Sequence, residues 1–98
     1  MAAYLIADIT VHDPDGYKAY AADVSALIAK HGGKYLVRGG GVDVLEGDWT
    51  PARLIIVEFP DRGTARRFYE DPAYQPLKRI RTSTSRGGLI VVDGHSGG

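Results

Sequence analysis

Residues 3–14 read AYLIADITVHDP, and this stretch decides the fold. Its apolar side chains recur at every second position, namely Leu5, Ala7, Ile9 and Val11. Such alternation predicts a strand over residues 3–11 with one wholly apolar face and one mixed face that carries Asp8. The pair Asp13-Pro14 then predicts the start of a helix, because aspartate caps free N–H groups and proline fits the first turn.

The helix that begins there is expected to run as far as the glycine pair Gly32-Gly33. Its larger side chains follow the three-and-four spacing of an amphipathic helix: Tyr17, Tyr20, Ala21, Val24, Leu27, Ile28 and His31. Glycine accepts the left-handed backbone that commonly ends a helix, so the pair marks its C-terminal end.

Two further strands are predicted in the middle of the chain. Residues 34–46 look extended, but Gly39-Gly40-Gly41 interrupts them and suggests a bulge or a bend. The segment Gly47-Asp48-Trp49-Thr50-Pro51 is typical of a turn. Residues 53–59 are almost continuously apolar, as expected for a central strand buried on both faces.

The last part of the chain predicts two helices and a strand. Asp61 can cap a second helix, which Asp71-Pro72 breaks. A third, short helix follows from the spacing of Tyr74, Leu77, Ile80 and Arg81. Residues 82–88 are rich in hydroxyl side chains and glycine, which favours a flexible loop, and residues 88–93 predict the final strand.

This order of elements predicts a single α+β domain over residues 1–98, with a core at about residues 3–94 and a flexible tail at residues 95–98. Strand, helix, strand, strand, helix, strand is the ferredoxin-like βαββαβ pattern. Two crossovers of the same hand give an antiparallel sheet in the order 4-1-3-2, with the helices on one face. The other face keeps apolar side chains that need a cover, and a second copy is the simplest one. These side chains are Tyr4, Ile6, Leu36, Leu54 and Ile56.

Composition excludes several classes of protein. Hydrophobic residues make up 44% and charged residues 24%, and the formal net charge is zero, which gives no electrostatic reason to expect a nucleic acid or a membrane surface as partner. The chain has no cysteine, so disulfides, thiolate metal sites and cysteine nucleophiles are excluded. No membrane-length apolar run and no basic leader are present, so a cytoplasmic protein is expected.

Several motifs, taken together and in order, make the chain similar to a known family. The resemblance spans about residues 3–94 and is carried by Tyr4 to Asp8, Asp13-Pro14 with Tyr17 and Tyr20, Gly32 to Gly40, Leu45 to Trp49, Glu58-Phe59-Pro60, and Phe68-Tyr69 with Asp71-Pro72 and Tyr74. The chain resembles domain-of-unknown-function family 1330. The resemblance implies a dimeric α+β barrel of ferredoxin-like subunits and no established reaction.

Asp8, Arg38 and Glu58 are the catalytic candidates, one from each of three predicted strands. If they share the open sheet face, three ionisable groups line a half-apolar barrel, where they must pair or change their pKa. In one hypothesis a carboxylate accepts a proton and Arg38 holds an anionic or enolate oxygen. In the other, the three side chains form a salt-bridged network that fixes the dimer.

Four further residues are candidates for binding a substrate at the rim of the pocket: His12, Trp49, Tyr69 and Arg81. His12 follows the first strand directly, and its position also fits a solvated turn. Trp49 is expected to close over the barrel or to dock on the second subunit. The three histidines are far apart, so neither a metal site nor a cofactor is predicted.

Two functions are carried forward from these residues. The first is a homodimeric small-molecule binder, with cofactor-free proton transfer or oxidation as its chemistry. The second is a non-catalytic dimeric interaction module in which the charges are structural. RNA binding on the sheet is disfavoured, because such sheets need exposed aromatic residues on their central strands.

Overall fold

The computed structural model describes residues 1–95 of the chain. Its elements are β1 (Ala3–Val11), α1 (Pro14–Lys30), β2 (Lys34–Arg38), β3 (Leu54–Phe59), α2 (Arg62–Glu70), α3 (Tyr74–Thr84) and β4 (Ser85–Asp93). The four strands form one antiparallel sheet in the order β2-β3-β1-β4. The predicted ferredoxin-like α+β topology is therefore confirmed. The predicted flexible tail lies mostly outside the described residues, since only His95 of it is described.

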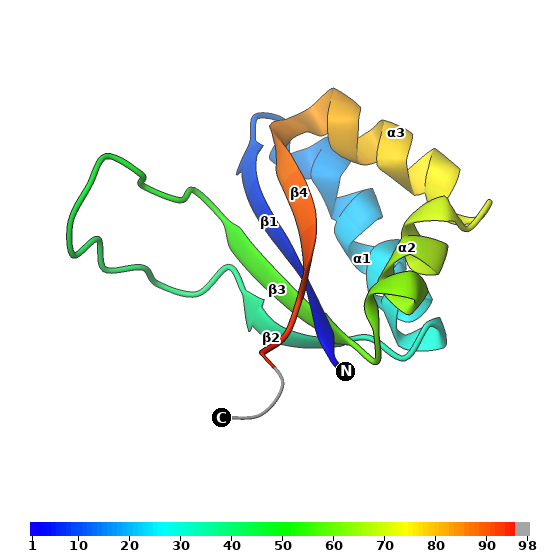
Figure 1. The fold of residues 1–98 in the computed structure, drawn as a ribbon. Helices are drawn as coiled ribbons and strands as arrows, with labels where there is room; N and C mark the ends of the chain where they lie inside the picture. Colours follow the sequence, from blue (N-terminus) through cyan, green and yellow to red (C-terminus); the bar gives the residue numbers. More distant parts are fainter. Residues whose placement is uncertain (96–98) are drawn as a thin grey trace.

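The three helices lie on one side of the sheet (Figure 1). Two of them begin where aspartate caps were predicted. Asp13 accepts a hydrogen bond from the Gly16 N–H at 3.2 Å, and Asp61 accepts one from the Thr64 N–H at 2.6 Å. The bond from the Thr64 backbone stabilises the carboxylate, which lowers the pKa of Asp61. No helix among the described residues is long and apolar enough to cross a membrane.

The core lies between the helices and the sheet. In β1 the alternation holds without a break, with Ala3, Leu5, Ala7 and Ile9 buried. Aromatic rings fill the space between them and the helices. The Tyr20 and Tyr74 hydroxyls lie 3.0 Å apart within this core, so their polar atoms are paired where water is excluded.

The predicted strand over residues 34–46 is wrong beyond Arg38. Gly39 takes a positive φ of 68°, and its N–H donates to the Leu54 carbonyl at 2.8 Å, which closes the pairing of β2 with β3. The chain then leaves the sheet as a long loop over residues 39–53 that projects beyond it (Figure 1). The physical reason is local, since Gly40 and Gly41 have no side chain to pack and nothing lies close to them.

The predicted loop over residues 82–88 is also wrong. Helix α3 continues to Thr84, and β4 follows at once from Ser85. The hydroxyl of Thr82 donates to the Lys78 carbonyl at 3.0 Å, and that of Thr84 to the Ile80 carbonyl at 2.6 Å. These side chains therefore bond back to the preceding helical turn, and their composition is compatible with a helix end.

The second face of the sheet carries no helix. One row of paired residues crosses it from β2 to β4: Val37, Ile56, Ile6 and Ile90. Residues directly opposite on neighbouring strands share a face, so this row is a continuous apolar strip. Ile90 is 60% exposed and Val92 is 44% exposed. The apolar open face expected from the sequence is present.

Candidate functional site

A β-bulge in β2 decides on which side of the sheet Arg38 lies. Tyr35 pairs with Val57, but the register shifts before Val37, and Arg38 pairs with Ile55. Arg38 therefore shares the helix side with Val57, and its Cζ atom lies 4.6 Å from the Tyr35 ring centre. An extra residue reverses the in-out order of a strand. The expectation that Asp8, Arg38 and Glu58 share one face is thus wrong for Arg38.

Asp8 stays on the open face, where it holds the long loop. One carboxylate oxygen accepts the indole N–H of Trp49 at 2.8 Å, and the other accepts the backbone N–H of Ala52 at 3.1 Å. The structure thus brings together Asp8 and Trp49, which the sequence singled out separately. Trp49 remains 64% exposed.

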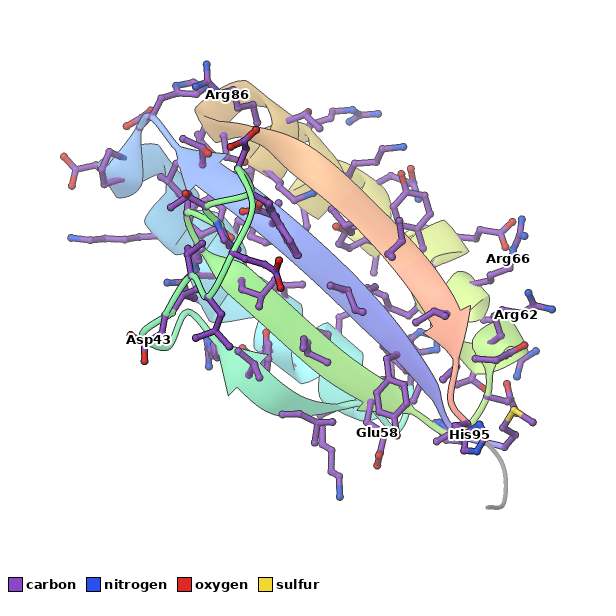
Figure 2. The ribbon with its side chains drawn as sticks, turned by 60° about the vertical axis from the view of Figure 1, so that its left-hand side comes forward. Asp43, Glu58, Arg62, Arg66, Arg86 and His95 are labelled. Carbon is purple, nitrogen blue, oxygen red and sulfur yellow. The ribbon has the colours of Figure 1, made fainter. Side chains whose placement is uncertain are left out.

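Glu58 and His12 lie away from Asp8 and from each other. Glu58 is opposite Tyr4 and Lys34 in the sheet, near one end of β3 (Figure 2), and its carboxylate lies 3.6 Å from the Lys34 ammonium. His12 is exposed just after β1, and its backbone N–H donates to the Thr84 carbonyl at 2.9 Å. The position of His12 fits the solvated turn.

The helix side of the sheet encloses a cavity of about 40 Å³. Three arginines line it, namely Arg38, Arg53 and Arg81, together with Tyr17, Tyr20, Tyr35 and Tyr74. The side-chain Nε atoms of Arg53 and Arg81 are buried without a hydrogen-bond partner. Arg81 as a whole is only 8% exposed. None of the ion pairs found among residues 1–95 involves either of these two arginines.

A larger groove of about 870 Å³ opens between α2 and β4. Tyr69, Arg62 and Arg66 come from α2, and Leu89, Ile90 and Val91 come from β4. Figure 2 shows Arg62 and Arg66 beside the end of β4. The groove and the cavity share Leu5, Arg81 and Leu89, so Arg81 borders both. Two of the predicted rim residues, Tyr69 and Arg81, therefore lie in one groove, whereas His12 and Trp49 do not.

Two tyrosines of the cavity, Tyr17 and Tyr20, have a raised pKa and are therefore hydrogen-bond donors at neutral pH. Burial raises the pKa of Tyr17, and the charge of Arg53 opposes that rise. Burial and the neighbouring Tyr74 hydroxyl raise the pKa of Tyr20. Among the described residues, neither a carboxylate nor a histidine lines the cavity. Guanidinium and phenol groups together suit a negatively charged oxygen, and they offer no general base.

Sequence reasoning missed Arg53, although a signal was present. Arg53, Ile55 and Val57 occupy alternate positions, and Val57 is buried against the helices. The same period-two rule that placed Asp8 on the open face puts Arg53 on the helix side. Residues 1–95 contain no group of three histidine, aspartate or glutamate side chains arranged to hold a metal ion.

By its fold and its groove, the protein is a ferredoxin-like α+β domain with a cationic cavity between its helices and its sheet. The model of the domain of unknown function DUF1330 matches residues 2–95. The chain belongs to this family, as the resemblance in its motifs indicated. No curated protein matches the chain.

Solved structures share the fold at low sequence identity. The RPA0582 protein of unknown function from Rhodopseudomonas palustris has a TM-score of 0.79 and 18% identity, covering 98% of this chain and 84% of that one. SnoaB, a cofactor-independent oxygenase from Streptomyces nogalater, has a TM-score of 0.69 and 18% identity, covering 98% and 95%. A protein described as an antibiotic biosynthesis monooxygenase has a TM-score of 0.54 and 16% identity, covering 98% and 100%.

Proposed function

We propose that this protein is a homodimer that binds a small organic molecule in the groove between α2 and β4. The observation that carries the proposal is Arg81, a buried arginine that lines the groove and has no ion-pair partner among the described residues. A buried charge is expensive unless something pairs with it. A groove of this size is in the range that small-molecule sites occupy.

The apolar strip on the open sheet face supports the homodimer. Ile6 and Ile56 lie at its centre, and Ile90 at its edge is largely exposed. Exposed apolar patches of this kind mark association surfaces, and a two-fold axis lets one patch cover itself. The loop that Asp8 holds carries a further exposed apolar side chain, Leu45, at 93% exposure.

The chemistry we propose is oxidation without a cofactor. A substrate with an acidic CH2 group loses a proton to give an enolate, which a guanidinium stabilises by its charge. Dioxygen is the oxidant: the CH2 carbon becomes a carbonyl that keeps one oxygen atom, and the other leaves as water with both hydrogens. SnoaB supports this chemistry only through its shared fold.

Glu70 is the carboxylate that lines the groove, and it is the candidate for the proton acceptor there. Asp8 and Glu58, the candidates from the sequence, lie on the open face of the sheet and bond to the loop and to Lys34, so neither lines this groove. Oxygen uptake with the enolisable ketone 2-tetralone, in the presence of a metal chelator, tests this chemistry. Uptake no faster than in buffer would contradict the oxidation and leave binding in place.

The alternative is a non-catalytic dimeric module, and Asp8 favours it. Both oxygens of this carboxylate hold the loop over residues 39–53, which is a structural role, although a different one from the salt-bridged network predicted for it. In this function the open face forms the dimer, the loop binds another protein, and the groove stays empty.

Native mass spectrometry of the protein purified from its own host tests the two functions. A dimer that carries additional small-molecule mass supports the proposal. A dimer of bare chains supports the homodimer and does not separate the two functions, and a monomer contradicts the homodimer in both.

A variant pair tests the surface that forms the dimer. Ile6→Glu places a charge at the centre of the apolar strip and is expected to give a monomer. Ala22→Glu, on the exposed side of α1, serves as the control and should leave the dimer intact. A dimer that survives Ile6→Glu would contradict the open face as the interface.

A further inference from the structure

We propose that the internal cavity is an oxyanion site, which takes the carboxylate of a ligand whose apolar body lies in the groove between α2 and β4. This inference rests on the proposed small-molecule function and names the chemical class of the ligand. Its basis is the combination of two buried Nε–H groups without an acceptor, the size of the cavity, and Arg81 as a lining residue of both the cavity and the groove.

Two arginines of the cavity each have a buried Nε–H group that lacks a hydrogen-bond acceptor. Arg53 and Arg81 each bury an Nε–H group without an acceptor, and both side chains line the same cavity. Unsatisfied buried donors are rare in folded proteins, and those that persist call for an explanation. An anion held between the two guanidinium groups supplies both missing acceptors.

The neighbouring groups of the cavity also favour an anion. Tyr17 lines the same cavity as Arg53 and Arg81, and its hydroxyl lies within hydrogen-bonding reach of the Arg53 side chain. Its phenol group is a further donor, since burial keeps it protonated. Because the lining holds no carboxylate among the described residues, no protein group competes for the guanidinium groups or repels an anion.

The arginines that line the groove differ in whether a neighbouring acidic side chain pairs with them. At the mouth, Arg62 pairs with Asp93 at 3.5 Å, and Arg66 pairs with Glu70 at 3.9 Å. These two arginines are thus balanced by neighbouring acids. Arg81, at the inner end, is the lining arginine of the groove without such a pair among the described residues.

The volumes of the cavity and of the groove indicate which part of the ligand each of them holds. A cavity of about 40 Å³ has room for about three waters, or for a group of similar bulk such as a carboxylate. The groove of about 870 Å³ accommodates a ring system against Tyr69, Leu89 and Val91. Arg81 lines both spaces, so under this proposal one molecule extends past its side chain from the groove into the cavity. A planar carboxylate also matches the planar fork of a guanidinium, which it can bind through two parallel hydrogen bonds.

Calorimetric titration with 2-naphthoate and with its neutral counterpart 2-naphthamide tests the inference. The two probes have the same ring system and differ in charge. We expect 2-naphthoate to bind at least ~10-fold more tightly, the effect of a charge-assisted hydrogen bond. Arg81→Met should abolish this preference, whereas Arg79→Met, an exposed position on the same helix, should keep it.

A second measurement uses only the wild-type protein, so it does not depend on the folding of a variant. The side-chain Nε–H resonances of Arg53 and Arg81 are followed by NMR during titration of the wild-type protein with 2-naphthoate. Formation of the missing hydrogen bonds should move both signals downfield, and 2-naphthamide should leave them in place.

The outcomes separate this inference from the proposed function. Equal binding of the two probes to the wild-type protein, with unmoved Nε–H signals, overturns the oxyanion site and leaves the groove as a binding site. Binding of neither probe counts against both. A preference for 2-naphthoate that survives in Arg81→Met also overturns the assignment, because the charge would then be recognised elsewhere.

Discussion

Replacing Asp8 by alanine separates a structural role for this carboxylate from a catalytic one. The change removes the acceptor of the Trp49 indole N–H at 2.8 Å and of the Ala52 N–H at 3.1 Å. Both bonds are exposed to solvent, so each contributes toward the low end of the usual range, about 0.5–1 kcal/mol. The expected loss is therefore about 1–2 kcal/mol, which lowers the melting temperature of a domain of this size by about 4–10 °C.

Trp49 itself reports the result, because it is the only tryptophan of the chain. In Asp8→Ala its fluorescence should shift to longer wavelength and become more accessible to acrylamide, since the loop is released. Thr10→Ala, on the same strand and the same face, is the control and should change neither property. If Asp8→Ala keeps the fluorescence and the melting temperature of the wild type but loses ligand binding, the anchoring role is refuted.

Three other substitutions or conditions test separate parts of the structure. Arg81→Met should stabilise the ligand-free protein by about 1–3 kcal/mol in urea denaturation, because the substitution removes a buried unpaired charge. A loss of stability in this variant would show that Arg81 has a partner. Gly87→Ala should lower the free energy of unfolding by at least about 2 kcal/mol, since φ is +149° and the new Cβ would overlap a backbone carbonyl of β1. The control Gly88→Ala, where the new Cβ has open space around it, should fold normally. The hydrogen bond from the His31 ring lowers the pKa of Asp71 from 3.8 to about 2, so the stability that ionised Asp71 contributes is complete above about pH 4 and is lost as the pH falls toward 2. Asp71→Asn should flatten this part of an acid-denaturation curve, and an unchanged curve would contradict the pairing of Asp71 with His31.

The order of the elements and the sheet topology could be predicted because each rests on short-range chemistry. The alternation in residues 3–11 and the aspartate caps at Asp13 and Asp61 each depend on neighbours a few positions away. Connections between such elements then allow few topologies. The loop over residues 39–53 was not predicted as such, because leaving a sheet depends on what β3 can pair with, and a single segment does not contain that information.

The candidate site was harder to predict for a specific reason. A single bulged residue in β2 moves Arg38 to the helix side, although the spacing from Leu36 had placed it on the open face. A bulge depends on the register between two strands, and neither strand alone specifies it. Tyr69 and Arg81 were selected as rim residues, and both line the groove. Arg53 could have been found, because its alternation with Ile55 needs no knowledge of the register.

The zero net charge of the chain conceals how its charges are distributed. Several acidic side chains bond to backbone N–H groups or to the loop, as Asp13, Asp61 and Asp8 do. Those carboxylates are held at helix starts and on the open face, so they are not available to neutralise Arg53 and Arg81 on the helix side. Under the oxyanion proposal the ligand supplies the counter-charge that the chain places elsewhere. The stability gained by Arg81→Met and the loss of carboxylate preference in the same variant should therefore appear together, since both follow from one unpaired guanidinium.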